Sequence, residues 1–341
     1  MKSTKDSYTL ALVACMIIFI LATGVISILT TKKILRENAH NSLTLLCDNV
    51  RMEFDRNIYS IEQSVNTLSS SAINHIHDFE SFKTDDAHVN EYSESLRDIL
   101  LYTAENTQGA LSVYIRYNPE FTNPSSGLFF VKNSETGKFE ETQVTDFSSS
   151  SSNETTWYDE PIAAGKPIWM NPYTNSTIGY SMISYVVPLY YDNEVFGVIG
   201  MDIDYEYIHK LITNYSAYDS GYAFLITEEG KIVVHKDYKM NSDFPNEKIK
   251  ENLFRVLDSN NNSGQYELSD NTKTFVCMKT ANGMVLCITA PDNEIYSAYY
   301  TLVYNLVILT LSALAITTLI SSFIVRRIFK YSEIDELTGI S

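Results

Sequence analysis

The sequence predicts an α+β protein with a long N-terminal helix, two tandem antiparallel-sheet modules and two flanking transmembrane helices. Two apolar segments without a charged residue lie near the ends of the 341-residue chain. A helical repeat of apolar residues follows the first segment, and short runs of alternating apolar and polar residues fill most of the remainder. At 45% hydrophobic and 12% aromatic, the composition is ample for packed cores.

The charge of the chain is acidic and unevenly distributed. The formal net charge is −17, and residues 38–298 hold 17 Lys and Arg against 37 Asp and Glu. An acidic surface repels the phosphates of DNA and RNA, and no basic stripe interrupts it. We therefore expect no nucleic-acid partner.

Both apolar segments are long enough to cross a membrane. Residues 7–31 and 295–325 carry no charge, and each exceeds the roughly 20 residues that cross a bilayer core. We expect transmembrane helices at 9–30 and 298–325, both in contact with membrane lipid. A cleaved signal peptide is the alternative for the first segment.

Basic residues next to the spans predict the orientation. Arg326, Arg327 and Lys330 follow the second span, which places that end in the cytoplasm. Residues 1–8 and 326–341 are then cytoplasmic, and 31–297 form an extracytoplasmic domain of a two-pass cell-membrane protein. Three bases at 32–36 oppose this orientation.

Apolar residues at steps of three and four, from Leu43 to Ile76, predict a stalk helix over about 34–76. Such a helix must bury its apolar stripe. The body of its own domain and the same helix of a second copy are both suitable partners. We expect both contacts, and hence a homodimer through the stalk helix.

We expect a first, distal module over about 80–205. Its predicted strands include "GALSVYIRYN", "SGLFFVKN", "KFEETQV", "IGYSMISYVVPLYY" and "EVFGVIGMDIDY", with a serine-rich loop at 148–152. Asp192-Asn193 is a hairpin turn signal. We expect one antiparallel sheet with its helices to one side.

A second, proximal module follows at about 206–297. It begins with "GYAFLITEEGKIVVHKD" and ends with three more short strands. Cys277 and Cys287 flank a turn in this module, and either a disulfide or two buried thiols fits them. A two-residue turn at Asn282-Gly283 would leave the cysteines about one residue out of register. His235 ends a strand and is expected to be solvated.

The order of these motifs resembles the double Cache (dCache_1) domain of bacterial chemoreceptors, sensor kinases and cyclases. The resemblance covers about 34–297 and rests on a long helix followed by "WY..P...G...W..PY", "VVPLYYDNEVFGVIGMDI" and "GYAFLITEEGKIVVH". It implies two PAS-like modules, of which the distal one binds a small molecule and the proximal one relays the signal.

The resemblance also implies a ligand site. The amino-acid-binding subset of the family has an Arg two residues before a Trp-Tyr pair, then a Tyr, an acid and a final Asp. This chain matches four positions, but Thr and Asn replace the Arg and the first acid. The candidate ligand-binding residues are Trp157, Tyr158, Tyr173, Asp202, Thr155 and Asn175.

These residue types favour a positively charged ligand. An ammonium group binds to a carboxylate such as Asp202 and to aromatic faces, whereas a carboxylate binds best to an Arg fork. Thr155 cannot supply that fork, and Arg116 is the nearby candidate. A cationic amine is favoured, then an α-amino acid, then a purine or other small polar solute. Alternatively, the aromatic residues form a core, and Asp202 or Asp204 caps the next helix.

No pattern in the sequence predicts catalysis, a cofactor or a metal. His75 and His77 cannot face one metal from a helix, and phosphate-loop, triad and C-x-x-C motifs are absent. We therefore expect a receptor, and no enzymatic activity from these residues. The alternatives are a purine or other small-molecule sensor of the same fold, or a tethered solute-binding module without an output.

The last residues, "EIDELTGIS", resemble the start of the GGDEF domain of diguanylate cyclases. The matching residues are Asp335, Leu337, Thr338, Gly339 and Ile340. The resemblance implies a cytoplasmic cyclase output that makes cyclic di-GMP, with its active site beyond Ser341.

Overall fold

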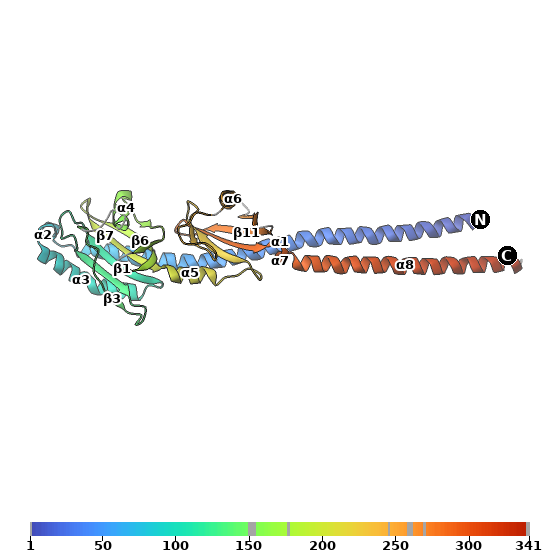
Figure 1. Ribbon diagram of the computed structural model, residues 1–341, viewed down its shortest axis with the longest axis horizontal. Coiled ribbons are helices and arrows are strands. Elements are labelled where there is room, and N and C mark those ends of the chain that lie inside the picture. The colour runs from blue at the N-terminus through green and yellow to red at the C-terminus, as the bar shows by residue number, and fades with distance from the viewer. Residues whose placement is uncertain are drawn as a thin grey trace. The chain divides into compact units, whose positions relative to one another are not determined.

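The computed structural model describes residues 2–148, 155–175, 178–244, 246–257, 262–268 and 271–338. The chain divides into two units. We call Met1–Ser42 with Pro291–Ser341 the terminal unit, and Leu43–Ala290 the sensor unit. Helix α1 (Lys2–His75) contributes to both units. Figure 1 shows the helices and strands and labels those for which there is room.

The terminal unit consists of the first part of α1, the short helix α7 (Asp292–Ile295) and helix α8 (Ser297–Thr338). Both long helices are long and apolar enough to cross a membrane, α8 over Ser297–Ile324. Their large apolar side chains are exposed, as for Phe19 at 70% and Leu309 at 66%. At Gly24 the helices approach closely, because an added Cβ would lie 3.4 Å from Thr310 Cγ2.

The distal module of the sensor unit is built on one antiparallel sheet in the order β3-β2-β1-β7-β6-β4, with β5 on β6. Its described strands are β1 Ala110–Tyr117, β2 Gly127–Lys132, β3 Phe139–Glu141, β4 Ile168–Trp169, β5 Tyr173–Asn175, β6 Tyr180–Tyr191 and β7 Glu194–Asp204. Its helices are α2 Phe79–Thr84, α3 Asp86–Glu105 and α4 Thr156–Ala164.

Two details of this sheet bear on the sequence predictions. Asp192 and Asn193 both have positive φ, 48° and 67°, which is the hairpin geometry their sequence predicts. The expectation that all helices lie to one side of the sheet is wrong. Tyr117 and Tyr185 face α3 and α1, while α4 packs on the opposite face through Trp157. The serine-rich loop lies outside the described residues from position 149 onward.

The proximal module has a second antiparallel sheet in the order β10-β11-β12-β8-β9. Apolar residues of helix α6 pack on one face of this sheet. The bounds are α5 Tyr205–Thr213, β8 Tyr222–Ile226, β9 Ile232–Val234, α6 Glu247–Leu257, β10 Ser263–Leu268, β11 Asn271–Lys279 and β12 Val285–Pro291.

The stalk part of α1 buries its apolar stripe on its own domain, which confirms one of the two expected contacts. The buried residues of the stripe include Leu43, Cys47, Val50, Phe54, Ile58, Ile61, Val65, Leu68 and Ala72. Polar contacts fix the helix to both modules. Glu62 accepts from Trp169 Nε1 at 2.8 Å in the distal module, and Asp55 accepts from the Ala281 N–H at 2.7 Å in the proximal module.

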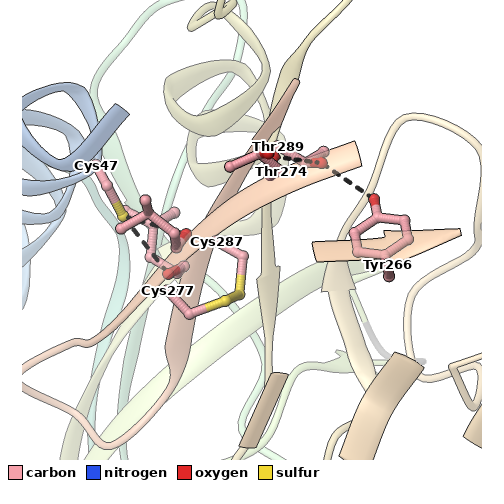
Figure 2. Close-up of a disulfide and its surroundings, with 8 residues drawn as sticks. Cys47, Tyr266, Thr274, Cys277, Cys287 and Thr289 are labelled. Atoms are coloured by element: carbon pink, nitrogen blue, oxygen red, sulfur yellow. Dashed lines mark hydrogen bonds between the residues drawn. A yellow bond between two sulfur atoms is a disulfide. The ribbon is translucent and has the colours of Figure 1, made fainter. Parts of the chain in front are cut away.

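Cys277 and Cys287 form a disulfide between β11 and β12 (Figure 2). The expected offset of one residue is wrong because the turn has three residues. The Thr280 N–H donates to the Met284 carbonyl at 2.9 Å, and Gly283 adopts φ +86°. Each cysteine lies three residues from this hydrogen-bonded pair, so the two are directly opposite. Cys47 remains a thiol, and burial raises its pKa to about 12.

The disulfide is expected to stabilise the proximal module. Closing a loop of this length reduces the entropy of the unfolded chain, and this raises the free energy of unfolding by about 2–3 kcal/mol. Replacing both Cys277 and Cys287 by Ser should lower the melting temperature by several degrees. A reductant should do the same to the wild type and leave the double variant unchanged. An equal effect of the reductant on both proteins would contradict the prediction.

The expectation that His235 is solvated is also wrong. Its side chain is only 5% exposed, with ring centroids 4.5 Å from Tyr238 and 5.1 Å from Tyr222. Burial lowers its pKa to about 4, so the imidazole is neutral at physiological pH. Aromatic rings around β8, which come from different segments of the chain, surround His235 and exclude water from it.

Candidate functional site

The candidate site lies on one face of the distal sheet, over strands β1, β7 and β6. Asp202 on β7 pairs with Ser112 on β1 and with Ser184 on β6. Paired residues of neighbouring strands project from the same face of a sheet. The row therefore brings two hydroxyls to the two sides of one carboxylate.

Asp202 is 1% exposed and keeps an unused acceptor. Its Oδ2 accepts a short hydrogen bond from Ser112 Oγ, while Oδ1 has no hydrogen-bond partner among the described residues. Burial raises the pKa of Asp202 to about 6, against the lowering effect of the Ser112 and Ser184 hydroxyls. The idea that Asp202 caps a helix is wrong, because Asp204 is the N-cap of α5. A buried acceptor without a partner indicates a missing donor.

Aromatic rings surround this carboxylate. Tyr114, Phe129, Trp157 and Tyr173 line the same pocket as Asp202, and the rings of Tyr114 and Trp157 meet edge to face with centroids 5.1 Å apart. Ser184 donates to the Tyr173 hydroxyl at 2.9 Å. Burial raises the pKa of Tyr114 and Tyr173, so both rings are neutral. The walls can therefore offer π-faces to a cation.

Gly200 makes room for one of these walls. It is the partner of Tyr114 across β1 and β7. A Cβ at position 200 would lie 2.5 Å from Tyr114 Cζ, much closer than van der Waals contact. The glycine therefore allows the Tyr114 ring to lie across β7 beside the carboxylate of Asp202.

Arg116 lines the other end of the pocket. It is 1% exposed, and its Nη2 donates to the carbonyl oxygens of Pro124 and Thr145, each at 2.7 Å. The guanidinium stacks on Phe147 at 4.4 Å, and its Nε has no partner among the described residues. Burial lowers the pKa of Arg116 to about 10, which leaves it charged at neutral pH. Arg116 thus holds two loops against β1, and its Nε stays unused.

The structure brings four of the six candidate residues to this pocket, Trp157, Tyr173, Asn175 and Asp202. Tyr158 is buried beside them, with its ring 4.8 Å from that of Phe147. Thr155 donates to Asp159 Oδ2 at 2.8 Å at the start of α4 and is not among the lining residues. The cavity between the lining side chains measures about 20 Å³, room for about one water molecule, so a bound solute must displace some of these side chains.

The sequence analysis did not predict four of the lining residues, namely Tyr114, Phe129, Val144 and Thr145. The sequence does contain a signal for Tyr114. Ser112, Tyr114 and Arg116 alternate along one strand, so they share a face. Val144 and Thr145 lie in an irregular segment with no such period. Among the described residues, no group of three or more His, Cys, Asp or Glu is placed to hold a metal ion.

The fold agrees with the comparison against family models. The model of the dCache_1 Cache domain matches residues 31–299, well over half of the chain. The chain belongs to the dCache_1 family. Its long N-terminal helix, two antiparallel-sheet modules and two apolar flanking helices are those of a dCache sensor domain, as the sequence predicted.

Curated relatives match only a short part of the dCache chain. It is 34% identical over 84 residues to the methyl-accepting chemotaxis protein PscA of Pseudomonas syringae pv. tomato, covering 25% of this chain. It is 32% identical over 81 residues to the methyl-accepting chemotaxis protein PctB of Pseudomonas aeruginosa, covering 24% of this chain. The matched segment spans 13% of each relative.

Solved structures share the fold over most of the domain. The ligand-binding domain of the Campylobacter jejuni chemoreceptor Tlp3 in complex with L-valine has a TM-score of 0.55 at 21% identity, over 78% of this chain and 98% of that one. The extracellular domain of mmHK1S-Z3 gives 0.57 at 19% identity, over 79% and 99%. At these identities the likeness shows the fold alone.

Proposed function

We propose that this chain is the sensory part of a two-pass membrane receptor whose distal module binds the ammonium group of a small organic solute at Asp202. The observation that carries the proposal is the buried carboxylate with one unused acceptor, Oδ1, in a pocket walled by aromatic rings. A charge-assisted hydrogen bond contributes about 1.5–3 kcal/mol, and each desolvated cation–π contact about 0.5–2 kcal/mol.

The remainder of the solute decides between an amine and an amino acid. Thr155 faces Asp159, so the Arg position of the amino-acid subset has no counterpart there. The Nε of Arg116 is unused, but both N–H groups of its Nη2 are engaged with backbone carbonyls, so it offers no free bidentate fork. We favour a cationic amine. An α-amino acid with Arg116 near its carboxylate is the second candidate, in keeping with the L-valine complex of the structurally similar Tlp3 domain.

A thermal-shift titration of the whole chain in detergent tests the proposal with matched solutes. Isobutylamine and isobutanol differ in the ammonium group, and L-valine adds a carboxylate to isobutylamine. We expect the amine to raise the melting temperature and the alcohol to have no effect. A larger shift with L-valine would assign the carboxylate partner to the pocket. A response to adenine or isobutanol without one to the amine would refute the ammonium site.

The orientation and the output are part of the same proposal. The sensor unit would face outward between the two apolar helices, and α8 would lead into a GGDEF output. The support for that output is the motif at Asp335–Thr338, the described end of α8; Gly339 and Ile340 lie outside the described residues. Ligand-dependent cyclic di-GMP synthesis by a chain extended beyond position 341 would test it.

We propose further that two copies pair along the stalk. Leu45, Met52 and Tyr59 of α1 are 65%, 56% and 59% exposed, although all three are large and apolar. Their spacing of seven residues is that of a coiled-coil seam, and the seam is self-complementary in a two-fold dimer. The buried stripe on the other side of α1 leaves this one available.

A cysteine at position 52 is expected to report the dimer. In a background with Cys15 replaced by Ser, Met52→Cys should give a disulfide-linked dimer within minutes of mild oxidation in membranes. Tyr102→Cys on α3, where the native side chain is 71% exposed, is the matched control for random collision. Equal cross-linking at positions 52 and 102 would contradict pairing through the stalk.

A further inference from the structure

The distal pocket has to enlarge before a solute fits into it. Because its cavity of about 20 Å³ holds about one water molecule, at least one wall must move. Strand β5 carries the lining residues Tyr173 and Asn175 and is only three residues long. Among the described strands it pairs with β6 alone, whereas β1 and β7 lie in the middle of the sheet. We therefore expect a solute to displace Tyr173.

The residues just before Tyr173 tie this wall to the rest of the pocket. We call residues 170–173 the linking segment, because they join β4 to the start of β5. The Met170 N–H donates to the Ser184 carbonyl at 2.8 Å, and Ser184 Oγ donates to the Tyr173 hydroxyl at 2.9 Å. Ser184 is also the residue that pairs with Asp202 across β6 and β7. Both ends of the linking segment are thus bound next to the carboxylate of the pocket.

The middle of the linking segment contacts the proximal module instead. The Pro172 carbonyl accepts from Asn241 Nδ2 at 2.7 Å. A second contact lies in the turn between β8 and β9. The pKa of Glu229 is lowered by a hydrogen bond from the Thr227 hydroxyl and, to a smaller extent, by one from the Asn171 side chain. The ends of one short segment therefore touch the pocket, while its middle touches the other module.

Asn241 is held firmly on the proximal side of this contact. Its N–H donates to the Ile232 carbonyl at 2.8 Å, and Ile232 is fully buried on β9. The backbone of Asn241 has φ 61°, which Asn and Gly adopt more readily than other residues. The donor is thus fixed to β9, so a displacement of Pro172 acts directly on the bond between the modules.

We infer that the linking segment couples occupancy of the distal pocket to the proximal module, and that the bond between Asn241 and Pro172 belongs to the empty state. The inference rests on the proposed function, because it requires a solute in the pocket. A solute that displaces Tyr173 moves the neighbouring Pro172 away from Asn241, and β9 loses a contact that it has while the pocket is closed. Because coupling is reciprocal, this bond also lowers the affinity for the solute.

Isothermal titration of the whole chain in detergent with isobutylamine tests the coupling. Asn241→Gly removes the donor and keeps a residue that accepts positive φ, and Asn241→Asp removes it with little change of shape. Both variants should bind isobutylamine about two- to tenfold more tightly than the wild type, the range that one hydrogen bond supports. Unchanged or weaker binding by either variant overturns the inference.

Asn262→Gly is the matched control for these variants. Asn262 also has a positive φ, 44°, and it precedes β10, which lies at the opposite edge of the proximal sheet from β9. The control should bind isobutylamine as the wild type does. A gain of affinity equal to that of Asn241→Gly would show a general effect of glycine and would also overturn the inference.

A measurement without solute separates this inference from the proposed function. Tyr173→Phe removes the hydroxyl that accepts from Ser184, and Asn241→Gly removes the bond to Pro172. If the linking segment couples the two bonds, the double variant should lose clearly less melting temperature than the sum of the single losses. Strict additivity overturns the coupling. Absence of isobutylamine binding by the wild type refutes the proposed function instead, and this comparison then decides the inference alone.

Discussion

Replacement of Asp202 by Asn is expected to abolish the response to cationic amines. Asn has nearly the same shape and can still accept from Ser112, but it carries no charge to bind an ammonium group. The affinity for isobutylamine should fall at least a hundredfold, as measured by titration calorimetry. Asp204→Asn is the matched control, because Asp204 caps α5 and Asn caps a helix equally well. Full amine binding by Asp202→Asn would refute the assignment.

The same substitution is expected to change how stability depends on pH. Burial raises the pKa of Asp202 in the folded protein from 3.8 to about 6, so the folded state binds this proton more tightly than the unfolded state. The stabilisation that comes from this bound proton is fully present below pH 4 and is lost as the pH rises through 6. Its loss lowers the free energy of unfolding by about 3 kcal/mol.

Chemical denaturation between pH 4 and pH 7.5 measures this effect. The difference in unfolding free energy between the wild type and Asp202→Asn should shift by about 3 kcal/mol over that range, in favour of the variant at the higher pH. Contributions from other titrating groups cancel in the difference. A difference that does not vary with pH would show that Asp202 titrates normally.

Gly200→Ala is expected to close the distal pocket. The new Cβ would lie 2.5 Å from Tyr114 Cζ, and the ring must then move into the space beside Asp202. Forcing an extra carbon into a packed site costs about 1–3 kcal/mol of stability. Amine binding should fall by two orders of magnitude in a titration, although position 200 itself touches no ligand.

A double variant distinguishes this displacement from general damage. Gly200→Ala combined with Tyr114→Leu removes the clashing ring, so the stability cost of the two changes should be less than their sum by 1 kcal/mol or more, on the order expected for contacting residues. Strict additivity would show that the alanine acts elsewhere. Partial recovery of amine binding in the double variant would support the displacement of Tyr114.

Local patterns were sufficient to predict most of the fold. The two uncharged segments, the apolar repeat along the stalk and the alternation in the strands each depend on residues close in sequence. The turn at Asp192-Asn193 is local for the same reason, since its two positive φ values suit those residues. The prediction of a two-residue turn at Asn282-Gly283 was wrong, because two-residue and three-residue loops use the same residue types. Only the pairing of the two strands selects between them.

The site was predicted in part, for a similar reason. The resemblance to the family pointed to Trp157, Tyr173 and Asp202, but Thr155 is engaged with Asp159 instead of lining the pocket. The contributions of Ser112 and Tyr114 depend on the register between β1 and β7. Register is set by long-range pairing, which no single stretch of sequence specifies.

The sequence by itself determined that this protein has apolar helices at both ends, a long stalk helix and two sheet modules, because each follows from the period of neighbouring residues. The tertiary structure alone decided the protonation and environment of the functional groups. Asp202 keeps an unused acceptor, and His235 is buried and neutral, because segments far apart in the chain enclose them. Burial and proximity are properties of the folded chain, and they set the charge that each of these side chains carries.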